Sequence, residues 1–516
     1  MRANHAAARR GPERWGKLGG SGASLTPQPG QDRGDAFRRW LDGRTVAVVG
    51  LARSGVAAAR LAMRLGSRVL ASDSAPRARL AAEAAGLERE GARVWAGGHP
   101  AAAFEGAELV VVSPGVPWDL PALAAARARG VLVIGELELA WRAMEADVIA
   151  ITGTNGKTTT TALTGELLAE QPRPVLVGGN IGTPLSLASL DFPRDGLVVA
   201  ETSSFQLEAT DRFRPRVAAV LNLAPDHLDR HGTVERYVNA KARIFANQTE
   251  ADCAVLNADD PATAALAART RARPLWFSRL RALDRGVFVK DGWVTARLEA
   301  AAEPVCPVAE IPLRGQHNVE NVLAAAACAL WVGVTPAAIR RRIGRFQAVT
   351  HRIEPVGARR GVAFFNDSKG TNVDSTIKAL ESFAEPIVLI AGGKGKGQDF
   401  APLGAAARGR VRHAVLIGED RDKIRPALAG AGAAVEDAAS MDGAVRAAAA
   451  AARPGDVVLL SPACASFDMF DNFEHRGEVF KAAVRALPPE GEARCGPEGE
   501  ARCGPEGEAR CGKEAR

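Results

Sequence analysis

The sequence predicts an α/β protein of three domains between two disordered tails, and three observations predict it. Short apolar runs that end at Gly, Pro or Asp alternate with Ala-rich stretches, which is typical of parallel sheets covered by helices. This alternation restarts near residue 148 and again near residue 362. A chain of 516 residues is also too long for one ordinary hydrophobic core, so several domains are expected.

The first domain is predicted over residues 45–143 and has a Rossmann-like, doubly wound pattern. Its strands are expected at 45–50, 68–73, 108–116 and 131–136. The loop after the first strand keeps only the outer glycines of a dinucleotide-binding GxGxxG pattern, and Asp73 ends the second strand as a ribose-binding acid would. An NAD-dependent enzyme is one interpretation of this domain alone, but it leaves a second glycine-containing loop, at residue 153, unexplained.

A central domain is predicted over residues 144–348 and a Rossmann-like C-terminal domain over residues 349–488. Strands of the central domain are expected at 148–152, 197–201, 217–223 and 253–257. Strands of the C-terminal domain are expected at 362–367, 386–393, 413–418 and 456–462. Ligands of open α/β sheets bind at the carboxyl ends of the strands, so the polar residues that follow these runs are candidates for function.

Both ends of the chain differ in composition from the three domains. Residues 1–44 are rich in Gly, Pro, Arg and Ser without an apolar period, which predicts disorder. Residues 489–512 are three copies of PEGEARCG, which contribute Cys495, Cys503 and Cys511 to a tail that runs to residue 516. A low-complexity tail is the interpretation that composition favours. A thiol metal site is the alternative, and it would need the three cysteines to converge.

Composition excludes several classes of protein. The chain is 47% hydrophobic and 24% charged, which fits a folded protein, and its net charge of +7 comes without a basic stripe interleaved with aromatics. We therefore expect no nucleic-acid partner. No apolar run reaches 18 residues and the basic N-terminus lacks an apolar segment, so neither membrane insertion nor secretion is expected. The remaining cysteines stand singly in apolar contexts, as in a reduced, cytoplasmic protein.

A phosphate-binding loop is the strongest local signal. An apolar strand leads into Gly153, Thr154, Asn155, Gly156, Lys157, Thr158 and Thr159, and a helical stretch follows. Glycines let backbone N–H groups approach phosphate oxygens, and the helix N-terminus favours an anion. Lys157 would meet the β- and γ-phosphates of ATP, and Thr158 would bind Mg²⁺. The alternative is a plain glycine-rich turn with an exposed lysine.

Two further candidates for binding Mg²⁺ follow strands of the same domain. Glu201 ends the run LVVAE, where a carboxylate can hold the ion, and His227 lies in the segment DHLD after the next strand. The alternatives are a solvated strand end and a structural histidine. Lys241 comes fourteen residues after His227, and from the residues alone it is an ordinary exposed helical lysine.

Polar clusters in the last third of the chain suit nucleotide and anion binding. Asn318 and Asn321 are three residues apart and share a helix face, where they either cap the helix or hydrogen-bond a base. Arg352 and the segment 366–372 gather donors and charge near a strand end. A Gly/Lys loop at 392–397 is weak evidence by itself, but it is available for a substrate because the phosphate loop is elsewhere.

Taken in order, these motifs resemble the blocks of the Mur ligase family. The resemblance covers about residues 45–487 and is closest to the branch that adds D-glutamate. It is found in the segments GTNGKTT (153–159), GGNIG (178–182), ETSSFQLE (201–208), DHLDRH (226–231), HNVEN (317–321), HR (351–352), NDSKGTN (366–372), GGKGKGQDF (392–400) and SPACASFDMFDNFEHRG (461–477).

The resemblance implies roles for individual residues. Glu201 would bind a first Mg²⁺ and His227 a second, while Lys241 matches a lysine that family members carbamylate into an anionic metal ligand. ATP contacts are implied for Asn318, Asn321, Arg352 and Asp367. D-glutamate contacts are implied for Lys369, Thr371, Lys396, Ser466 and Phe473. Contacts with the nucleotide-linked substrate are implied for Asn180, Ser54 and Asp73, although Arg53 replaces a usually apolar residue, and Phe467 stands where Leu is usual.

The function implied is ligation in peptidoglycan precursor synthesis. ATP and two Mg²⁺ ions would activate UDP-N-acetylmuramoyl-L-alanine as an acyl phosphate, which the amine of D-glutamate then attacks. We expect a cytoplasmic monomer. Two other functions remain open from the residues themselves. A P-loop ATPase or kinase would release or transfer phosphate without an amine, and a nucleotide-sensing module would lack the metal ligands.

Overall fold

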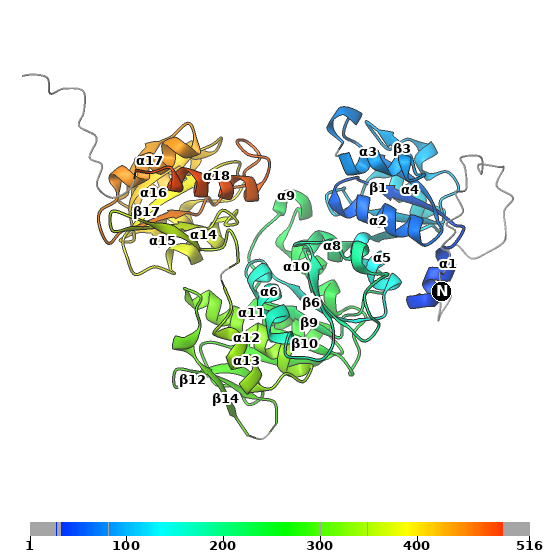
Figure 1. Ribbon diagram of the computed structural model, residues 1–516, viewed down its shortest axis with the longest axis horizontal. Coiled ribbons are helices and arrows are strands. Elements are labelled where there is room, and N and C mark those ends of the chain that lie inside the picture. Colours follow the sequence, from blue (N-terminus) through cyan, green and yellow to red (C-terminus); the bar gives the residue numbers. More distant parts are fainter. Residues whose placement is uncertain (1–26, 28–31, 81, 300, 348, 489–516) are drawn as a thin grey trace, which may run out of the picture.

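Three β-sheets of five, nine and six strands, each with helices packed on it, make up the computed structural model (Figure 1). The structure describes residues 27, 32–80, 82–299, 301–347 and 349–488. Each sheet is formed by a continuous part of the chain, because β1–β5, β6–β14 and β15–β20 follow one another in sequence. This confirms the predicted α/β fold with three domains.

The first sheet is parallel throughout, in the order β3-β2-β1-β4-β5. All five residues of β1 are buried, because apolar side chains pack against both faces of the sheet. Apolar runs without alternation are typical of such doubly covered strands. The elements are β1 (Thr45–Val49), α2 (Arg53–Arg64), β2 (Arg68–Asp73), α3 (Ala82–Arg89), β3 (Arg93–Ala96), β4 (Leu109–Val112), α4 (Pro121–Ala128), β5 (Leu132–Gly135) and α5 (Glu136–Ala143).

The predicted disorder of residues 1–44 is wrong for the last part of that segment. Residues 34–41 form helix α1 (Gly34–Leu41), whose Phe37, Trp40 and Leu41 are buried in the core of the first domain. Their spacing of three and four residues places them on one face of a helix. The helix is so short that this periodicity does not stand out within a Gly- and Arg-rich segment. The preceding residues 1–26 and 28–31 lie outside the described part of the chain.

The second sheet has nine strands in the order β14-β13-β12-β11-β10-β9-β6-β8-β7. The strands from β7 to β12 run parallel and β12–β14 form an antiparallel meander. Its strands are β6 (Asp147–Thr152), β7 (Val175–Gly179), β8 (Leu197–Glu201), β9 (Val217–Val220), β10 (Cys253–Asn257), β11 (Arg273–Ser278), β12 (Gly286–Lys290), β13 (Trp293–Arg297) and β14 (Glu303–Pro307). Its helices are α6 (Lys157–Leu168), α7 (Leu185–Ala188), α8 (Ser204–Glu208), α9 (Leu228–His231), α10 (Val234–Ala242), α11 (Pro261–Ala264), α12 (Gln316–Trp331) and α13 (Pro336–Ile343).

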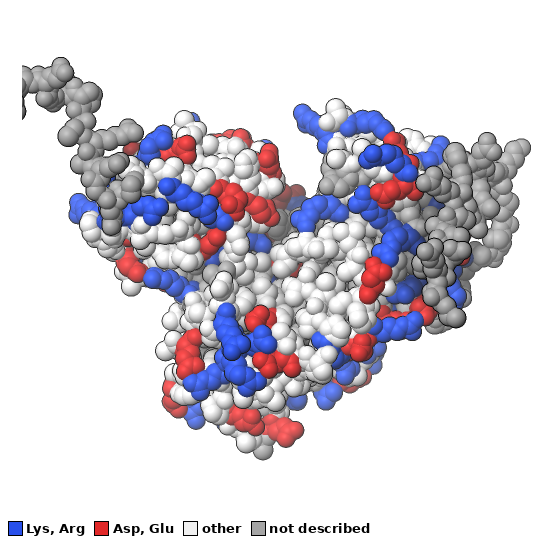
Figure 2. Space-filling model, in the orientation of Figure 1, with Lys and Arg blue, Asp and Glu red and all other residues white. Residues whose placement is uncertain are grey.

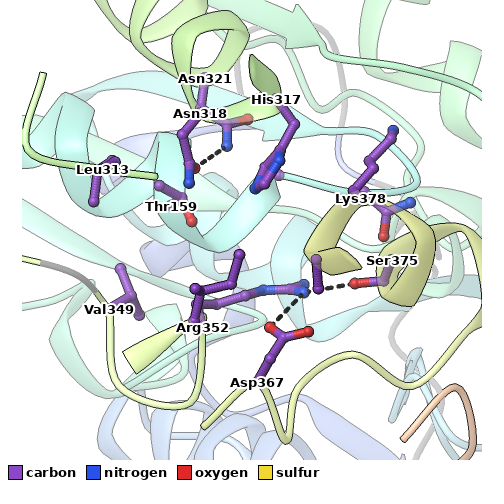
Figure 3. A pocket seen from close by; sticks show the side chains of 14 residues that line it. Thr159, Leu313, His317, Asn318, Asn321, Val349, Arg352, Asp367, Ser375 and Lys378 are labelled. Atoms are coloured by element: carbon purple, nitrogen blue, oxygen red, sulfur yellow. Dashed lines mark hydrogen bonds and ion pairs between the residues drawn. The ribbon is translucent and has the colours of Figure 1, made fainter. Parts of the chain in front are cut away.

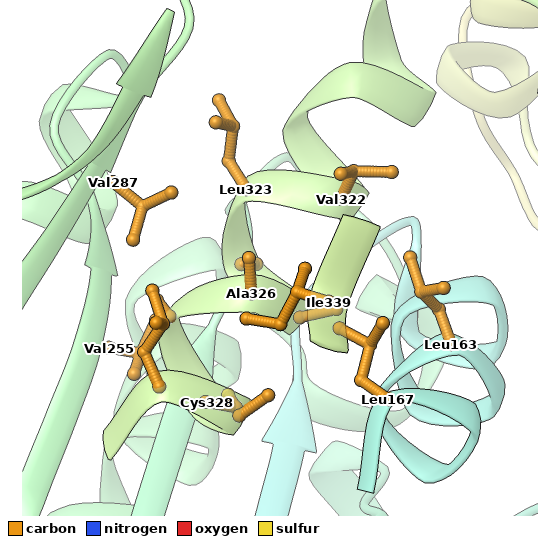
Figure 4. Packing of buried hydrophobic residues seen from close by; sticks show 14 of the residues in the cluster. Leu163, Leu167, Val255, Val287, Val322, Leu323, Ala326, Cys328 and Ile339 are labelled. Carbon is orange, nitrogen blue, oxygen red and sulfur yellow. The ribbon is translucent and has the colours of Figure 1, made fainter. Parts of the chain in front are cut away.

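One core of the second domain fixes the helices that carry the nucleotide motifs. Leu163 and Leu167 of α6 pack with Val322 and Leu323 of α12 and with Ile339 of α13 (Figure 4). These side chains are at most 1% exposed. Removing a buried Leu or Ile side chain typically costs about 2–5 kcal/mol, so this packing holds the starts of α6 and α12 firmly against each other.

The third sheet has the order β15-β16-β20-β17-β18-β19, with β15 antiparallel to β16 and the other neighbours parallel. Its strands are β15 (Glu354–Arg359), β16 (Val362–Asn366), β17 (Ile387–Gly392), β18 (Val411–Ile417), β19 (Ala434–Asp437) and β20 (Val457–Leu460). Its helices are α14 (Val373–Leu380), α15 (Ala401–Ala407), α16 (Arg421–Gly430), α17 (Met441–Ala451) and α18 (Phe473–Arg485). Short 3₁₀ turns occur at Arg77–Arg79, Ala101–Phe104, Arg243–Phe245, Ala265–Arg269 and Val308–Glu310.

Several predicted strands are shorter than expected at their carboxyl ends. The run 108–116 is a strand only to Val112, and the run 217–223 only to Val220. The residues that follow form loops, although the first backbone N–H after each strand, that of Ser113 and that of Leu221, still donates to a neighbouring strand. In the described part of the chain, no helix has the length and apolar character needed to cross a membrane. Acidic and basic side chains are interspersed on the face shown in Figure 2.

Candidate active site

The phosphate loop lies between β6 and α6 in the strand–loop–helix arrangement that the motif requires. Gly153 and Gly156 adopt φ of 152° and 82°, and a Cβ on Gly156 would lie 2.2 Å from the Asn321 side-chain oxygen. Both positions therefore need glycine. The Lys157 Nζ donates to the carbonyl oxygens of Gly153 (2.9 Å) and Thr154 (2.7 Å), which keeps the ammonium inside the loop. Burial lowers the pKa of Lys157.

Glu201 is the last residue of β8 and is 1% exposed. The Asn180 side-chain nitrogen donates to its Oε1 at 2.8 Å, whereas its Oε2 is buried without any hydrogen-bond partner. An unpaired buried carboxylate oxygen is costly. Because Thr158 lines the same cavity and Mg²⁺ prefers oxygen ligands, this orphaned oxygen fits a bound cation.

His227 immediately precedes α9, with a left-handed backbone (φ 53°, ψ 36°). Its ring packs edge-on against Phe205, with centroids 4.9 Å apart. Burial lowers the pKa of His227 to about 4, so its imidazole is neutral at neutral pH and has a lone pair to offer. Within the described residues, no cluster of three or more His, Cys, Asp and Glu side chains could hold a metal by itself. Protein sites for Mg²⁺ usually combine one or two side chains with phosphates and water, so Glu201 and His227 remain the candidate ligands.

Lys241 is buried, so its interpretation as an exposed helical lysine is wrong. It is 2% exposed, on α10, and its Nζ donates to the Gly153 carbonyl oxygen (2.7 Å) and lies 3.3 Å from Thr152 Oγ1. The Nζ also lies over the Tyr237 ring, 4.8 Å from its centroid. Burial, reinforced by repulsion from Lys157, lowers the pKa of Lys241 well below its usual value.

One cavity of about 450 Å³ brings most of the predicted residues together. The first domain contributes Pro114, at the start of the loop after β4. The second domain contributes Lys157, Thr158, Asn180, Glu201, His227 and Lys241. The third domain contributes Arg352, Lys369, Thr371, Lys396, Phe467 and Phe473. The walls therefore come from all three domains.

Eight residues that line this cavity were not predicted as site residues, namely Pro114, Ser203, Ser204, Phe205, Asp226, Tyr237, Asn372 and Phe467. Tyr237 is the only tyrosine of the chain, and its hydroxyl lies 2.9 Å from Thr154 Oγ1. Asp226 accepts from the Asn372 side chain (3.2 Å) and lies 3.5 Å from Lys396 Nζ. Asp226 and Asn372 lie within the segments 226–231 and 366–372, which contain predicted site residues. Their closeness in sequence to those residues could have identified them.

A second, smaller pocket lies between the start of α12 and the third domain (Figure 3). The Asn321 side-chain nitrogen donates to Asn318 Oδ1 at 2.9 Å, so the two residues share a face as predicted. Helix α12 is preceded by Gly315 and has no side-chain cap, which excludes the capping alternative. The pocket is lined by Asn155, Gly156, Thr159, Leu313, His317, Asn318, Asn321, Val349, Arg352, Ile353, Asp367, Ser375, Lys378 and Ala379.

Arg352 and Asp367 lie next to each other in this pocket (Figure 3). The guanidinium of Arg352 lies 3.8 Å from an Asp367 oxygen and donates to Ser375 Oγ at 2.8 Å (Figure 3). Asp367 is 1% exposed and accepts from Ser461 Oγ at 2.8 Å. Burial raises the pKa of Asp367 to about 6. The pair presents a donor and an acceptor side by side, which is what a ribose hydroxyl needs.

On the third domain, two lysines face the larger cavity. Lys369 lies over the Phe473 ring (5.2 Å), and burial lowers its pKa to about 8. Lys396 is held by Asp226, as described above. Ser466 is buried with an unpartnered Oγ, but it is not among the residues that line the cavity.

The residues predicted to bind the uridine part lie apart from the cavity. Ser54 is in the first turn of α2, and the Asp73 carboxylate accepts from the backbone N–H groups of Leu51 (2.6 Å) and Ala75 (2.7 Å). Asp73 is therefore already used in shaping its loops. A separate pocket of about 290 Å³ lies between α2 and α7, where Arg53 donates to the Gly182 carbonyl oxygen.

Three α/β domains that meet over a phosphate loop define a nucleotide-dependent enzyme with one reaction chamber. The chain belongs to the Mur ligase family: the Mur ligase MurD-like N-terminal domain matches residues 44–135, the Mur ligase middle domain residues 151–329, and the Mur ligase glutamate ligase domain residues 351–464.

Two relatives that match this chain over nearly their full length have the same name. A UDP-N-acetylmuramoylalanine–D-glutamate ligase of Acidobacterium capsulatum is 50% identical over 448 residues, which are 86% of this chain and 97% of the relative. The ligase of the same name from Koribacter versatilis is 47% identical, and the match covers 86% of this chain and 98% of the relative. Among solved structures, a pseudomurein peptide ligase type C of Methanothermus fervidus has a TM-score of 0.55 at 18% identity, over 86% of this chain and 100% of that one. The UDP-N-acetylmuramate-alanine ligase of Thermotoga maritima has a TM-score of 0.54 at 20% identity, and the match covers 86% of this chain and 99% of that one. At such identities the structures show a shared fold.

Proposed function

We propose that this chain is an ATP-dependent ligase that joins D-glutamate to UDP-N-acetylmuramoyl-L-alanine, a step in peptidoglycan precursor synthesis. One observation carries the proposal. A single cavity places the phosphate-loop residue Lys157 opposite the cations Lys369 and Lys396 of the third domain, in a chain whose 50% identical relative is named for this ligation. The substrates are those in that name. We further propose a cytoplasmic monomer, since one chain provides all the described walls of the cavity.

The reaction must overcome the poor electrophilicity of a carboxylate. The alanyl carboxylate attacks the γ-phosphorus of ATP, ADP leaves, and an acyl phosphate forms. The amine of D-glutamate then attacks the acyl carbon, and the amide forms as phosphate and a proton are released. Lys157 would offset the negative charge that develops on the transferred phosphoryl oxygens. Asn318, Asn321, Arg352 and Asp367 would hold the nucleotide, with the backbone of residues 153–159 around its phosphates.

Mg²⁺ would be held by Thr158 and Glu201 at one position and by His227 and Lys241 at a second. When bound, Mg²⁺ supplies charge neutralisation for the phosphates. The orphaned Glu201 oxygen supports the first position. For the second, burial lowers the pKa of Lys241, and the unprotonated form of its amine can add CO₂ and release a proton, which gives a carbamate whose oxygens suit Mg²⁺.

The acceptor would bind on the third domain, where its two carboxylates need cations and donors. Lys369, Thr371 and Lys396 line the cavity, Phe473 lies beneath Lys369, and Ser466 lies on the adjoining segment. The donor would extend from Asn180 toward Ser54 and Asp73 on the first domain. Its carboxylate would thus lie between the γ-phosphate and the incoming amine, in a chamber that excludes water and protects the acyl phosphate from hydrolysis.

The experiment is an assay of ADP release and amide formation with ATP, Mg²⁺ and UDP-N-acetylmuramoyl-L-alanine while different amino acids are offered. We expect one amide per ADP with D-glutamate, and no amide with L-glutamate or D-alanine. Lys157→Ala is the matched inactive control, with an expected loss of roughly 10²- to 10⁴-fold in rate. ADP release that needs neither the donor nor an amine would identify an ATPase instead.

A further inference from the structure

Helix α14 of the third domain reaches the phosphate loop of the second domain through one carboxylate. Oδ2 of Asp374, in the first turn of α14, accepts a hydrogen bond from the side-chain nitrogen of Asn155. The same oxygen pairs with Lys378 Nζ at 3.1 Å, one turn along the helix. The backbone N–H of Asn155 is in turn held by Asn222 Oδ1 at 2.8 Å. A single carboxylate oxygen therefore joins α14, the phosphate loop and a lysine.

Lys378 lines the nucleotide pocket opposite α12 (Figure 3). Its neighbours there include Arg352 and His317, and its side chain is 27% exposed. Burial, together with the positive charges of Lys378 and Arg352, lowers the pKa of His317 to about 3, so His317 is neutral. Lys378 and Arg352 thus provide two cations on the third-domain wall of a pocket whose other wall is the phosphate loop and α12. Such a pair of cations suits an anionic ligand.

We propose that Lys378 is a nucleotide-binding residue and that Asp374 is its positioning residue, and that together they clamp the third domain to the phosphate loop when nucleotide is bound. The inference rests on the proposed function and deepens it, because it names how the third domain senses ATP. Asp374 holds Lys378 against the pocket and holds Asn155 in the loop. Lys378 reaches the phosphates or ribose of the nucleotide from the side opposite Lys157. Nucleotide binding and closure of the third domain are then coupled, because the same two residues take part in both.

The test compares variants of the full chain in two measurements, namely steady-state kinetics and calorimetric titration with MgADP. Lys378→Met keeps the length of the side chain but removes its charge, and we expect it to raise the KM for ATP and the Kd for ADP roughly 10-fold with kcat within about two-fold. Asp374→Ala should raise the same constants to a similar degree and also lower kcat, because Asn155 is released. Asp374→Glu should restore at least part of both, and the KM for D-glutamate should stay unchanged in all three.

The matched control is Asp437→Asn, which breaks an ion pair with Arg425 on the same domain, outside both pockets. Unchanged nucleotide constants are expected for it. Wild-type affinity for ADP in Lys378→Met would overturn the binding role. A fall in melting temperature for Asp374→Ala, without any change in the nucleotide constants, would overturn the positioning role. If the wild-type chain makes no amide with D-glutamate, the proposed function fails, whereas the ADP titrations still decide the clamp.

Discussion

Lys241 shows why a single residue can be misjudged from its neighbours in the sequence. The segment YVNAKARIF reads as a helix with a solvent-exposed lysine, and α10 does form there. The burial of Lys241 comes from the packing of α10 over the loop at Gly153, 88 residues earlier in the chain. Glu201 and His227 were easier to place, because strand ends of a parallel sheet meet at one edge.

Replacing Lys241 by alanine should abolish most activity, and small acids should restore part of it. If a carbamate on Lys241 supplies a metal ligand, its loss removes an anion that formate or acetate can imitate in the vacated space. We expect a loss of roughly 10²-fold or more and a partial recovery that depends on acid concentration. Initial rates with and without each acid provide the measurement, and chloride at equal ionic strength is the control. Full activity of the alanine variant would contradict the role.

The buried carboxylate of Asp367 should lower the stability of the folded chain when it is charged, so a substitution that removes the charge should stabilise the protein. Burial raises its pKa from 3.8 to about 6, so between these values the folded chain binds a proton that the unfolded chain does not. Its contribution to stability is therefore greatest below pH 4 and is lost as pH rises toward 6. The shift corresponds to about 3 kcal/mol of destabilisation at higher pH.

Asp367→Asn should remove that cost while it weakens nucleotide binding. At pH 8 we expect the variant to be about 1–3 kcal/mol more stable than the wild-type chain in urea unfolding, because asparagine keeps an acceptor for Ser461 without the buried charge. Near pH 4 the two chains should be equally stable, which serves as the internal control. ADP titration should show weaker binding. A variant that is less stable at pH 8 than at pH 4 relative to wild type would contradict the reasoning.

At the scale of single elements, α5 joins the first domain to the second through a buried carboxylate. Glu138 is 0% exposed and accepts from the backbone N–H groups of Asp211, Arg212 and Phe213 at 2.9–3.0 Å. Arg142, 2% exposed, donates to the carboxylates of Glu138 (2.6 Å) and Asp211 (2.7 Å). The loop before β9 is thereby fixed to the end of the first domain.

Glu138→Ala should be strongly destabilising. It leaves three N–H groups without their acceptor and removes the buried partner of Arg142, and breaking such a pair typically costs about 3–5 kcal/mol. The free energy of unfolding in urea measures the effect. Glu250→Ala breaks the exposed pair with Arg271 and should leave the free energy of unfolding nearly unchanged, because solvent screens exposed ion pairs. Equal effects of the two variants would show that burial of Glu138 is unimportant.

The strands that the sequence predicted are those with continuous apolar runs. β8 and β10 have the predicted bounds, and every residue in them is buried. The strands that were missed lie near sheet edges and are partly exposed: β19 has no buried residue, and β3 has none either. Strands that face solvent on one or both sides need no apolar run, so their sequences do not stand out from loops.

At the scale of the whole molecule, the three domains could be inferred from the two restarts of the α/β pattern, but their arrangement could not. The contacts between domains join residues that lie far apart in the sequence. Arg64 pairs with Asp191 (2.9 Å) between the first and second domains, and Lys396 pairs with Asp226 between the second and third. No local pattern marks either partner, so the shape of the shared cavity emerges only in the folded chain.

The repeat tail should be dispensable for folding and activity. Residues 489–516 lie outside the described part of the chain, and their composition lacks apolar anchors. Truncation after Leu487 should leave ADP release and melting temperature unchanged. It should also remove every fast-reacting thiol, because the four described cysteines are buried and burial raises the pKa of Cys306, Cys328 and Cys464 to about 12. Titration with a chromogenic disulfide, before and after unfolding, counts both groups. A marked loss of stability would show that the tail contacts the domains.

The last prediction concerns water exclusion from the chamber between the domains. Phe467 is 72% exposed, yet it lines the cavity, as does Pro114 of the first domain. We expect Phe467→Ala to admit water to the acyl phosphate, so that ADP release without D-glutamate rises and the yield of amide per ADP falls several-fold. Phe467→Leu should stay coupled. Leu280→Ala removes a comparably exposed apolar side chain (67%) that does not line this cavity and is the matched control. The ratio of amide to ADP is measured for each variant. A ratio near one for Phe467→Ala, with a reduced rate, would mean that Phe467 contacts substrate without shielding it.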